Sequence, residues 1–231
     1  FRFDPDKGFF LNGHHVKLMG TNRHQDYYKM GNALADEMHV RDLRLLEEMG
    51  GNFLRISHYP QDPQVTEFCD RRGIVASVEI PIVDYITMSD KFRQNGVDMA
   101  TEMVWQDYNS PSVVLWAYMN EPLLRRPYDD NLEIKDEYFA ALRGVASSIE
   151  NAIRELDPRR YTMMVFHSSV SQYAEAGMLD IPMVLGGNVY WGWYSNDLHR
   201  VEEKFRRNHG YAPDKAFLVT EYGADADPRV H

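Results

Sequence analysis

Residues 138–166 read YFAALRGVASSIENAIRELDPRRYTMMVF, and they indicate the fold class more directly than any other stretch of the chain. In the first part, apolar residues recur three or four positions apart, which is the spacing of one face of an α-helix. The residues of this stripe are Tyr138, Leu142, Val145, Ile149, Ile153 and Leu156. Asp157-Pro158 ends the helix, and the short apolar run Tyr161–Phe166 that follows is typical of a buried β-strand.

The same pattern of short apolar runs and longer amphipathic segments extends in both directions from this stretch. The other candidate strands are Val16–Met19, Phe53–Ile56, Ile74–Val78, Val113–Trp116, Met183–Leu185 and Ala216–Val219. The segments between the strands are predicted to be helices, most clearly in two further places. Their apolar stripes are Val40, Leu43, Leu46 and Met49, closed by Gly50-Gly51, and Leu198, Val201 and Phe205, closed by Gly210.

Strands that alternate with helices predict βαβ units and a parallel sheet, either open and doubly wound or closed into a (β/α)₈ TIM barrel. No glycine-rich fingerprint follows the first strand, which disfavours the dinucleotide-binding form of the open sheet. We therefore predict an α/β fold of the TIM-barrel type, with residues 1–231 as a single domain. Because only seven strands are found, the barrel is expected to lack its eighth βα unit. Turn signals around Phe9 predict an N-terminal β-hairpin within residues 1–15.

Composition excludes several classes of function. The chain has 231 residues with 25 Lys plus Arg against 35 Asp plus Glu, a net charge of −10, so it would repel nucleic acids and anionic membrane surfaces. No apolar run approaches the roughly 20 residues that span a bilayer. Cys69 is the only cysteine, so an internal disulfide and a cysteine-based metal site are both excluded. The compartment stays undetermined.

Polar and aromatic residues follow every candidate strand, and in a parallel barrel these positions converge on one mouth. Two carboxylates stand out, Glu121 after the fourth strand and Glu221 after the seventh. Retaining glycosidases need such a pair about 5–5.5 Å apart, with one group as acid and the other as nucleophile. Trp191 and Trp193 follow the sixth strand and could stack on a sugar ring, although either could also fill the core.

Four motifs in order closely resemble glycoside hydrolase family 2, and its β-galactosidase branch in particular. The motifs are Gly20-Thr21-Asn22-Arg23-His24-Gln25-Asp26, Arg55-Ile56-Ser57-His58-Tyr59-Pro60, Met119-Asn120-Glu121 and Thr220-Glu221-Tyr222-Gly223. The resemblance covers essentially the whole chain. It implies a (β/α)₈ catalytic domain that acts on terminal β-galactosides with retention of configuration, through a covalent glycosyl-enzyme intermediate.

The resemblance also implies roles for individual residues. Glu121 matches the general acid/base and Glu221 the nucleophile, while Asn120 matches the amide that bonds the sugar 2-hydroxyl. Arg55 matches an arginine beneath the nucleophile that would hold Glu221 ionised. The remaining substrate-binding candidates are His58, Tyr190, His24 and His167, together with Trp191 and Trp193, and for His24 and His167 a structural role is an equal alternative.

Some members of the family bind Mg²⁺ near the third strand, but here no histidine stands beside Glu79, so no metal or other cofactor is expected. The expected partner is a glycoside substrate, with β-sandwich domains elsewhere in the full-length protein and the oligomeric state left open. Two alternatives remain. One is a β-glucuronidase or another uronidase of the same family, because Tyr190-Trp191-Gly192-Trp193-Tyr194 also resembles that branch. The other is a non-catalytic sugar-binding barrel or an inactive fragment.

Overall fold

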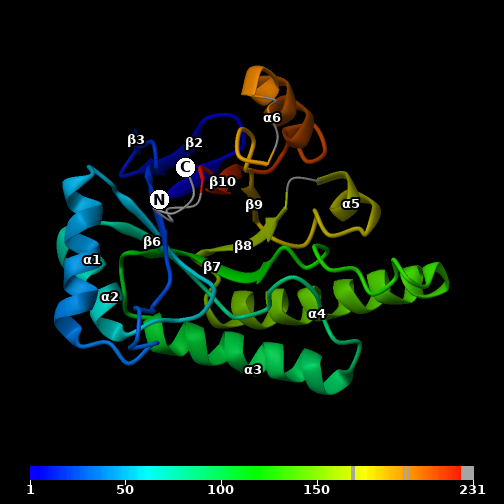
Figure 1. The fold of residues 1–231 in the computed structure, drawn as a ribbon, viewed down its shortest axis with the longest axis horizontal. Coiled ribbons are helices and arrows are strands. Elements are labelled where there is room, and N and C mark those ends of the chain that lie inside the picture. The colour runs from blue at the N-terminus through cyan, green and yellow to red at the C-terminus, as the bar shows by residue number, and fades with distance from the viewer. Residues whose placement is uncertain (168–169, 195, 197, 225–231) are drawn as a thin grey trace.

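A computed structural model describes residues 1–167, 170–194, 196 and 198–224, and in them seven parallel strands form one sheet that curls into a nearly closed barrel (Figure 1). The strands follow one another across the sheet in chain order, from β4 to β10. They are β4 (Gly20–Arg23), β5 (Phe53–Ile56), β6 (Val75–Glu79), β7 (Val113–Asn120), β8 (Tyr161–Phe166), β9 (Val184–Asn188) and β10 (Phe217–Glu221). This is the α/β TIM-barrel architecture that the alternating pattern predicts.

A helix lies in each of the six connections between these strands, and the helices surround the sheet (Figure 1). They are α1 (Asp36–Glu48), α2 (Pro63–Arg72), α3 (Asp90–Asp107), α4 (Lys135–Leu156), α5 (Val170–Glu175) and α6 (Val201–His209), and short 3₁₀ turns, η1 (Leu132–Ile134) and η2 (Leu198–Arg200), precede α4 and α6. Helices α3 and α4 pack side by side against β7, and α1 packs beside α2. No helix in the described part of the chain is long and apolar enough to span a membrane.

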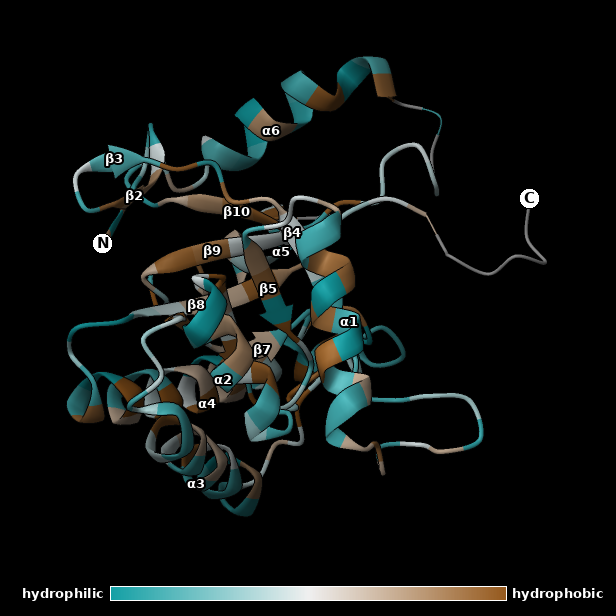
Figure 2. Ribbon diagram, turned by 90° about the vertical axis from the view of Figure 1, so that its left-hand side faces the viewer, coloured by the Kyte–Doolittle hydropathy of each residue, from teal (hydrophilic) through white to brown (hydrophobic). Residues whose placement is uncertain are grey.

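The core has two layers, one inside the barrel and one between the barrel and its helices. All eight residues of β7 are buried, and in the middle of the strand successive residues belong to different layers. Leu115 and Ala117 belong to the cluster inside the barrel, whereas Trp116 and Tyr118 belong to the cluster beneath the helices. Burial on both faces explains the near-continuous hydrophobicity of strands such as β7, and Figure 2 shows brown segments in the sheet, for example in β9.

A small antiparallel sheet packs against the barrel where β8 begins. It consists of β1 (Arg2–Asp4), β2 (Gly8–Leu11) and β3 (His14–His15). Phe3 and Phe9 are buried together with their ring centroids 5.0 Å apart, and Phe3 lies 5.0 Å from Tyr161, the first residue of β8. Both phenylalanines join the cluster that lines the barrel, so this sheet covers its amino-terminal end. The hairpin predicted within residues 1–15 is present, with β3 added.

The position of the first barrel strand differs from its prediction. The apolar run Val16–Met19 precedes the strand, and β4 begins at Gly20, which pairs with Phe53 of β5. A Cβ atom on Gly20 would lie 1.6 Å from the carbonyl oxygen of Phe53, so only glycine allows the two backbones to approach this closely. Hydrophobicity alone therefore placed this strand four residues too early.

Strands β4 and β10 are the two ends of the sheet. Some of their Cα atoms lie within 8 Å of one another, but no strand among residues 1–167, 170–194, 196 and 198–224 pairs with either across the gap. The count of seven strands agrees with the prediction.

Candidate active site

Several of the candidate residues lie at the carboxyl end of the barrel. Arg55 is on β5 and His58 follows that strand, while Asn120 ends β7 and Glu221 ends β10. Glu121 comes directly after β7. Because the strands are all parallel, their carboxyl ends share one rim, and the contacts of these side chains show that residues far apart in sequence meet there.

Arg55 is the centre of the cluster and has only 1% of its surface exposed. Its Nε and one terminal nitrogen donate to the Glu79 carboxylate at 3.2 and 3.0 Å. The same terminal nitrogen donates to Asn120 Oδ1 at 2.8 Å, and the other donates to Glu221 Oε1. Burial alone would disfavour the guanidinium charge, but Glu79 and Glu221 outweigh burial and raise the pKa of Arg55.

Glu79 ends β6 and links Arg55 to His58, whose Nδ1 bonds the Glu79 carboxylate. Burial opposes ionisation of Glu79, yet the Arg55 charge and the His58 contact hold its pKa below the ordinary value. The other ring nitrogen of His58 lies 3.8 Å from Glu221 Oε1. Sequence analysis gave Glu79 no part in the site, although a carboxylate at the end of a buried strand is the signal that singled out Glu121.

Glu221 receives a donor at each carboxylate oxygen. Arg55 donates to Oε1, and the Tyr190 hydroxyl donates to Oε2 at 2.7 Å. Burial and the hydrogen bond to Glu221 raise the pKa of Tyr190. The Glu221 side chain keeps 12% of its surface exposed, so it remains open to the mouth of the barrel.

Glu121 lies in a different environment. Its backbone has a φ of 51°, in the left-handed region that glycine favours, and its N–H donates to the carbonyl of Val165 at 2.8 Å. Such a conformation costs of order 1–3 kcal/mol in a residue with a side chain, and strain of this kind concentrates at functional sites. Burial and the nearby Glu221 charge raise the pKa of Glu121, although a hydrogen bond from Asn188 opposes them.

Two amides link Glu121 to Arg55, which in turn donates to Glu221, and a hydroxyl donates to one of these amides. The Nδ2 group of Asn188 donates to Glu121 Oε1 at 2.9 Å and to Asn120 Oδ1 at 3.1 Å. The Thr220 hydroxyl donates to Asn188 Oδ1 at 2.8 Å. Asn188 and Thr220 were not among the predicted site residues, although both stand at strand ends and Thr220 belongs to the motif Thr220-Glu221-Tyr222-Gly223; the sequence does not show which groups they contact.

The two less secure histidines occupy different places. The His24 ring lies 5.2 Å from the His58 ring at an angle of 66°, and burial, followed by His58, lowers the pKa of His24. His24 therefore borders the cluster. His167 shares a hydrogen bond of 2.7 Å with the Tyr173 hydroxyl on α5, and burial lowers its pKa to about 4. The structure thus gives His167 a neutral imidazole and a partner outside the carboxylate cluster.

The two tryptophans also separate. Trp191 packs edge-on against Phe205 of α6, with ring centroids 5.0 Å apart, so its contacts fasten α6 to the barrel. The ring centroids of Trp193 and Tyr194 are 6.4 Å apart, and those of Tyr194 and Tyr190 are 5.6 Å apart. Trp193 is therefore connected to the nucleophile candidate through two tyrosine rings, and Trp191 is directed elsewhere.

The described residues do not fit a metal ion at the third barrel strand. No group of three or more His, Cys, Asp or Glu side chains that could hold a metal occurs in the part of the chain that the structure describes. The carboxylate of Glu79 is occupied by Arg55 and His58, and a guanidinium in that position would repel a cation. We derive no chemical step through a metal.

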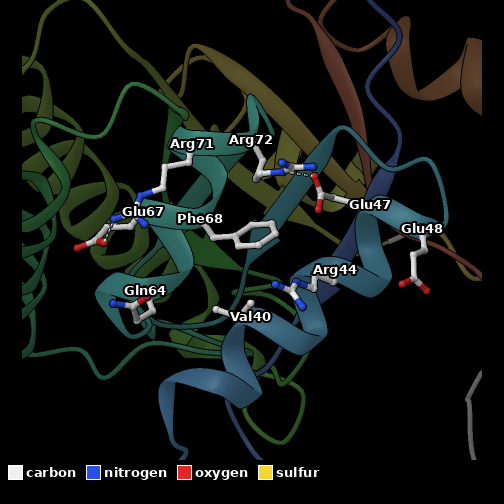
Figure 3. A pocket seen from close by; sticks show the side chains of 9 residues that line it. All are labelled: Val40, Arg44, Glu47, Glu48, Gln64, Glu67, Phe68, Arg71 and Arg72. Atoms are coloured by element: carbon white, nitrogen blue, oxygen red, sulfur yellow. Dashed lines mark hydrogen bonds and ion pairs between the residues drawn. The ribbon is translucent and has the colours of Figure 1, made fainter.

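A groove of about 520 Å³ lies on the outer surface between α1 and α2 (Figure 3). Val40 and Phe68 form its apolar part, and an ion pair between Glu47 and Arg72 crosses it. Its lining contains none of the residues at the mouth, so the groove belongs to the packing of two helices and not to the site.

Comparison with known proteins gives one consistent family. Residues 5–229 match the family described as glycosyl hydrolases family 2, TIM barrel domain. A β-glucuronidase from Bacteroides fragilis is 36% identical over 234 residues, which cover 98% of this chain and 31% of that protein. The chain thus spans about a third of the length of this curated relative.

Solved structures agree with this. The structure of Bacteroides uniformis β-glucuronidase 2 covalently bound to cyclophellitol-6-carboxylate aziridine is 42% identical, with a TM-score of 0.92 over all of this chain and 28% of that one. A structure from Bacteroides fragilis that carries a provisional β-galactosidase name is 30% identical, with a TM-score of 0.80 over 96% of this chain and 30% of that one.

Proposed function

The chain belongs to the glycosyl hydrolases of family 2 as their TIM-barrel domain, and from this premise we propose that it hydrolyses β-glucuronides with retention of configuration. The observation that supports a catalytic role is the contrast between two carboxyl groups. Glu221 accepts a hydrogen bond at each carboxylate oxygen, one from the Arg55 guanidinium and one from the Tyr190 hydroxyl. Burial raises the pKa of Glu121, which favours the protonated acid.

In the first step, a Glu221 oxygen attacks the anomeric carbon, and the bond from that carbon to the leaving-group oxygen breaks. The electron pair of that bond stays with the leaving oxygen, which takes the proton of Glu121. The products are a glycosyl ester on Glu221, the free aglycone alcohol and an ionised Glu121. To Asn120, whose Oδ1 accepts from Arg55 and Asn188, we assign the bond to the sugar 2-hydroxyl.

In the second step, Glu121 now acts as a base. It takes a proton from water while the water oxygen attacks the anomeric carbon from the face that the aglycone left. The ester bond to Glu221 breaks, and its electron pair returns to the carboxylate, where Arg55 and Tyr190 again stabilise it. Two displacements at one carbon restore the original configuration.

The choice of β-glucuronides rests on the relatives. The curated Bacteroides fragilis relative is named a β-glucuronidase, and the Bacteroides uniformis protein is covalently bound to cyclophellitol-6-carboxylate aziridine, a compound named as a carboxylate. Arg55 is not available to bind a uronate carboxylate, because it is buried and paired with Glu79 and Glu221. β-Galactosides, which the sequence motifs suggest, are the second candidate, and the provisionally named Bacteroides fragilis structure favours them.

A panel of 4-nitrophenyl β-glycosides separates these proposals. The protein would be expressed from its complete reading frame, because we expect β-sandwich domains and further substrate contacts to accompany the barrel. We expect kcat/KM to be highest for the β-glucuronide. A higher value for the β-galactoside would favour the second candidate, and hydrolysis of neither compound would support a non-catalytic sugar-binding protein. Glu221→Gln serves as the inactive control.

A further inference from the structure

The direction of each hydrogen bond around Glu121 can be deduced from Arg55. A guanidinium carries donors only, so the group that Asn120 presents to Arg55 must be its carbonyl oxygen. The Asn120 amide therefore has one orientation. Its NH₂ group points to the other side.

The orientation of Asn120 in turn fixes that of Asn188. Asn120 Oδ1 and the Glu121 carboxylate both lie within hydrogen-bond distance of the Asn188 amide, at 3.1 and 2.9 Å. Two acceptors require that Asn188 present its NH₂ group to them, one proton to each. Its Oδ1 must then face Thr220, which lies 2.8 Å away, so the Thr220 hydroxyl is the donor. Asn188 and Thr220 are buried, at 2% and 7% exposure.

We propose that Asn188 and Thr220 are positioning residues, with Thr220 fixing the amide of Asn188 so that the amide holds the carboxyl group of Glu121 in one orientation at the mouth. Thr220 precedes Glu221 on β10, so the strand that bears the proposed nucleophile also orients the proposed acid. This inference rests on the proposed function, because it assigns Glu121 the acid/base role.

A donor to the carboxylate favours its ionised form, so the Asn188 contact opposes the effect of burial on the pKa of Glu121. The other charged or titratable groups that act on Glu121 are Glu221, Asp84 and Arg55, and Glu121 in turn acts on Tyr173 and Tyr190. Substitutions at Asn188 and Thr220 leave these groups in place. Any shift of the pKa of Glu121 in such variants therefore reports the loss of the Asn188 amide contact.

The experiment compares Thr220→Val and Asn188→Leu, which preserve shape and remove the hydrogen-bonding groups, with Thr220→Ser, which keeps the hydroxyl. The basic limb of the kcat/KM profile reports loss of the proton of the acid. We expect this limb to move upward by about one pH unit in Asn188→Leu and by a smaller amount in Thr220→Val. We also expect kcat for substrates with poor leaving groups to fall several-fold in both variants. Thr220→Ser should keep both the basic limb and kcat of the wild-type protein.

Thr162→Val is the matched control. Thr162 is a fully buried threonine on β8. Its hydroxyl donates to the Glu150 carboxylate at 2.8 Å, and Glu150 lies on α4, outside the site at the mouth of the barrel. This variant should lose stability without moving the basic limb. A basic limb in Thr220→Val and Asn188→Leu that coincides with that of the wild-type protein would overturn the inference.

A second readout keeps the inference separate from the proposed function. The pKa of Glu121 can be followed by ¹³C NMR of protein labelled at glutamate Cδ, with Glu121→Gln identifying the signal. If the wild-type protein hydrolyses no glycoside, the proposed function fails, but the titration still decides the inference. An upward shift in Asn188→Leu and Thr220→Val supports the positioning role, and an unchanged titration contradicts it.

Discussion

Glu121 and Glu221 carry the same carboxyl group, and the residues that distinguish them come from other strands. Arg55 on β5 and Tyr190 after β9 donate to Glu221, whereas Glu121 has a buried setting and one amide donor. Sequence alone could place both glutamates at strand ends. The family resemblance also paired Arg55 with Glu221, but the sequence could not show that Asn188, 67 positions away along the chain, donates to Glu121.

Glu121→Gln tests the acid role directly. The amide cannot give a proton to the departing oxygen, so substrates with poor leaving groups should lose about 10²- to 10⁴-fold in kcat/KM. Activated substrates such as 2,4-dinitrophenyl glycosides depend less on protonation and should lose less. Equal losses for both classes in steady-state assays would contradict the acid role.

The burial and ion pair of Glu79 lead to a prediction about how the free energy of unfolding depends on pH. Its folded pKa lies below the ordinary value, so its contribution to the free energy of unfolding is present above about pH 4.5 and is lost as pH falls through the folded pKa. Removing one partner of a buried ion pair costs about 3–5 kcal/mol, and because Arg55 keeps Glu221, we expect Glu79→Gln to lie at the lower end at pH 7.

The difference in the free energy of unfolding between wild type and Glu79→Gln should become smaller as the pH is lowered from 7. Urea denaturation at each pH measures it. Glu67→Gln is the control, because Glu67 pairs with Arg71 on the exposed face of α2 and should change stability little at any pH. A deficit for Glu79→Gln that is constant with pH would mean that the ion pair with Arg55 does not set the stability.

At the scale of elements, the sequence located the barrel strands well where hydrophobicity decided their position. Phe53–Ile56 and Tyr161–Phe166 coincide with β5 and β8, and the apolar stripe from Tyr138 to Ile153 is the buried face of α4. The first strand was misplaced, because β4 has no apolar run and its position depends on the close approach of Gly20 to Phe53. A contact between two backbones leaves little trace in a hydropathy pattern.

The N-terminal sheet should contribute to the stability of the barrel. Phe9 is buried against Phe3 within the cluster that lines the barrel, so Phe9→Ala should lower the free energy of unfolding by about 3–5 kcal/mol. Phe10, the next residue of β2, is only partly buried and lies over Arg2 and beside His15. Phe10→Ala is therefore the control and should cost clearly less, as measured by chemical denaturation. Equal losses would show that the sheet does not seal the barrel.

At the scale of the whole molecule, the fold brings together a carboxyl group directly after β7 and one at the end of β10, although two strands, β8 and β9, lie between β7 and β10 in the sheet. A retaining mechanism requires the carboxyl groups of Glu121 and Glu221 to lie about 5–5.5 Å apart. We expect this separation in a crystal structure of the protein with a bound glycoside analogue. A separation of about 9 Å would leave room for a water molecule between them and would indicate inversion.

The most direct test of the account is to trap the glycosyl-enzyme intermediate. The protein is incubated with a 2-deoxy-2-fluoro-β-glucuronyl fluoride, digested with a protease and examined by mass spectrometry. We predict a single glycosyl adduct on the peptide that contains Glu221, and its absence in Glu221→Gln. An adduct on a different carboxylate, or turnover of β-glucuronides to the α-configured sugar without any adduct, would contradict the assignment of Glu221 as the nucleophile of a retaining enzyme.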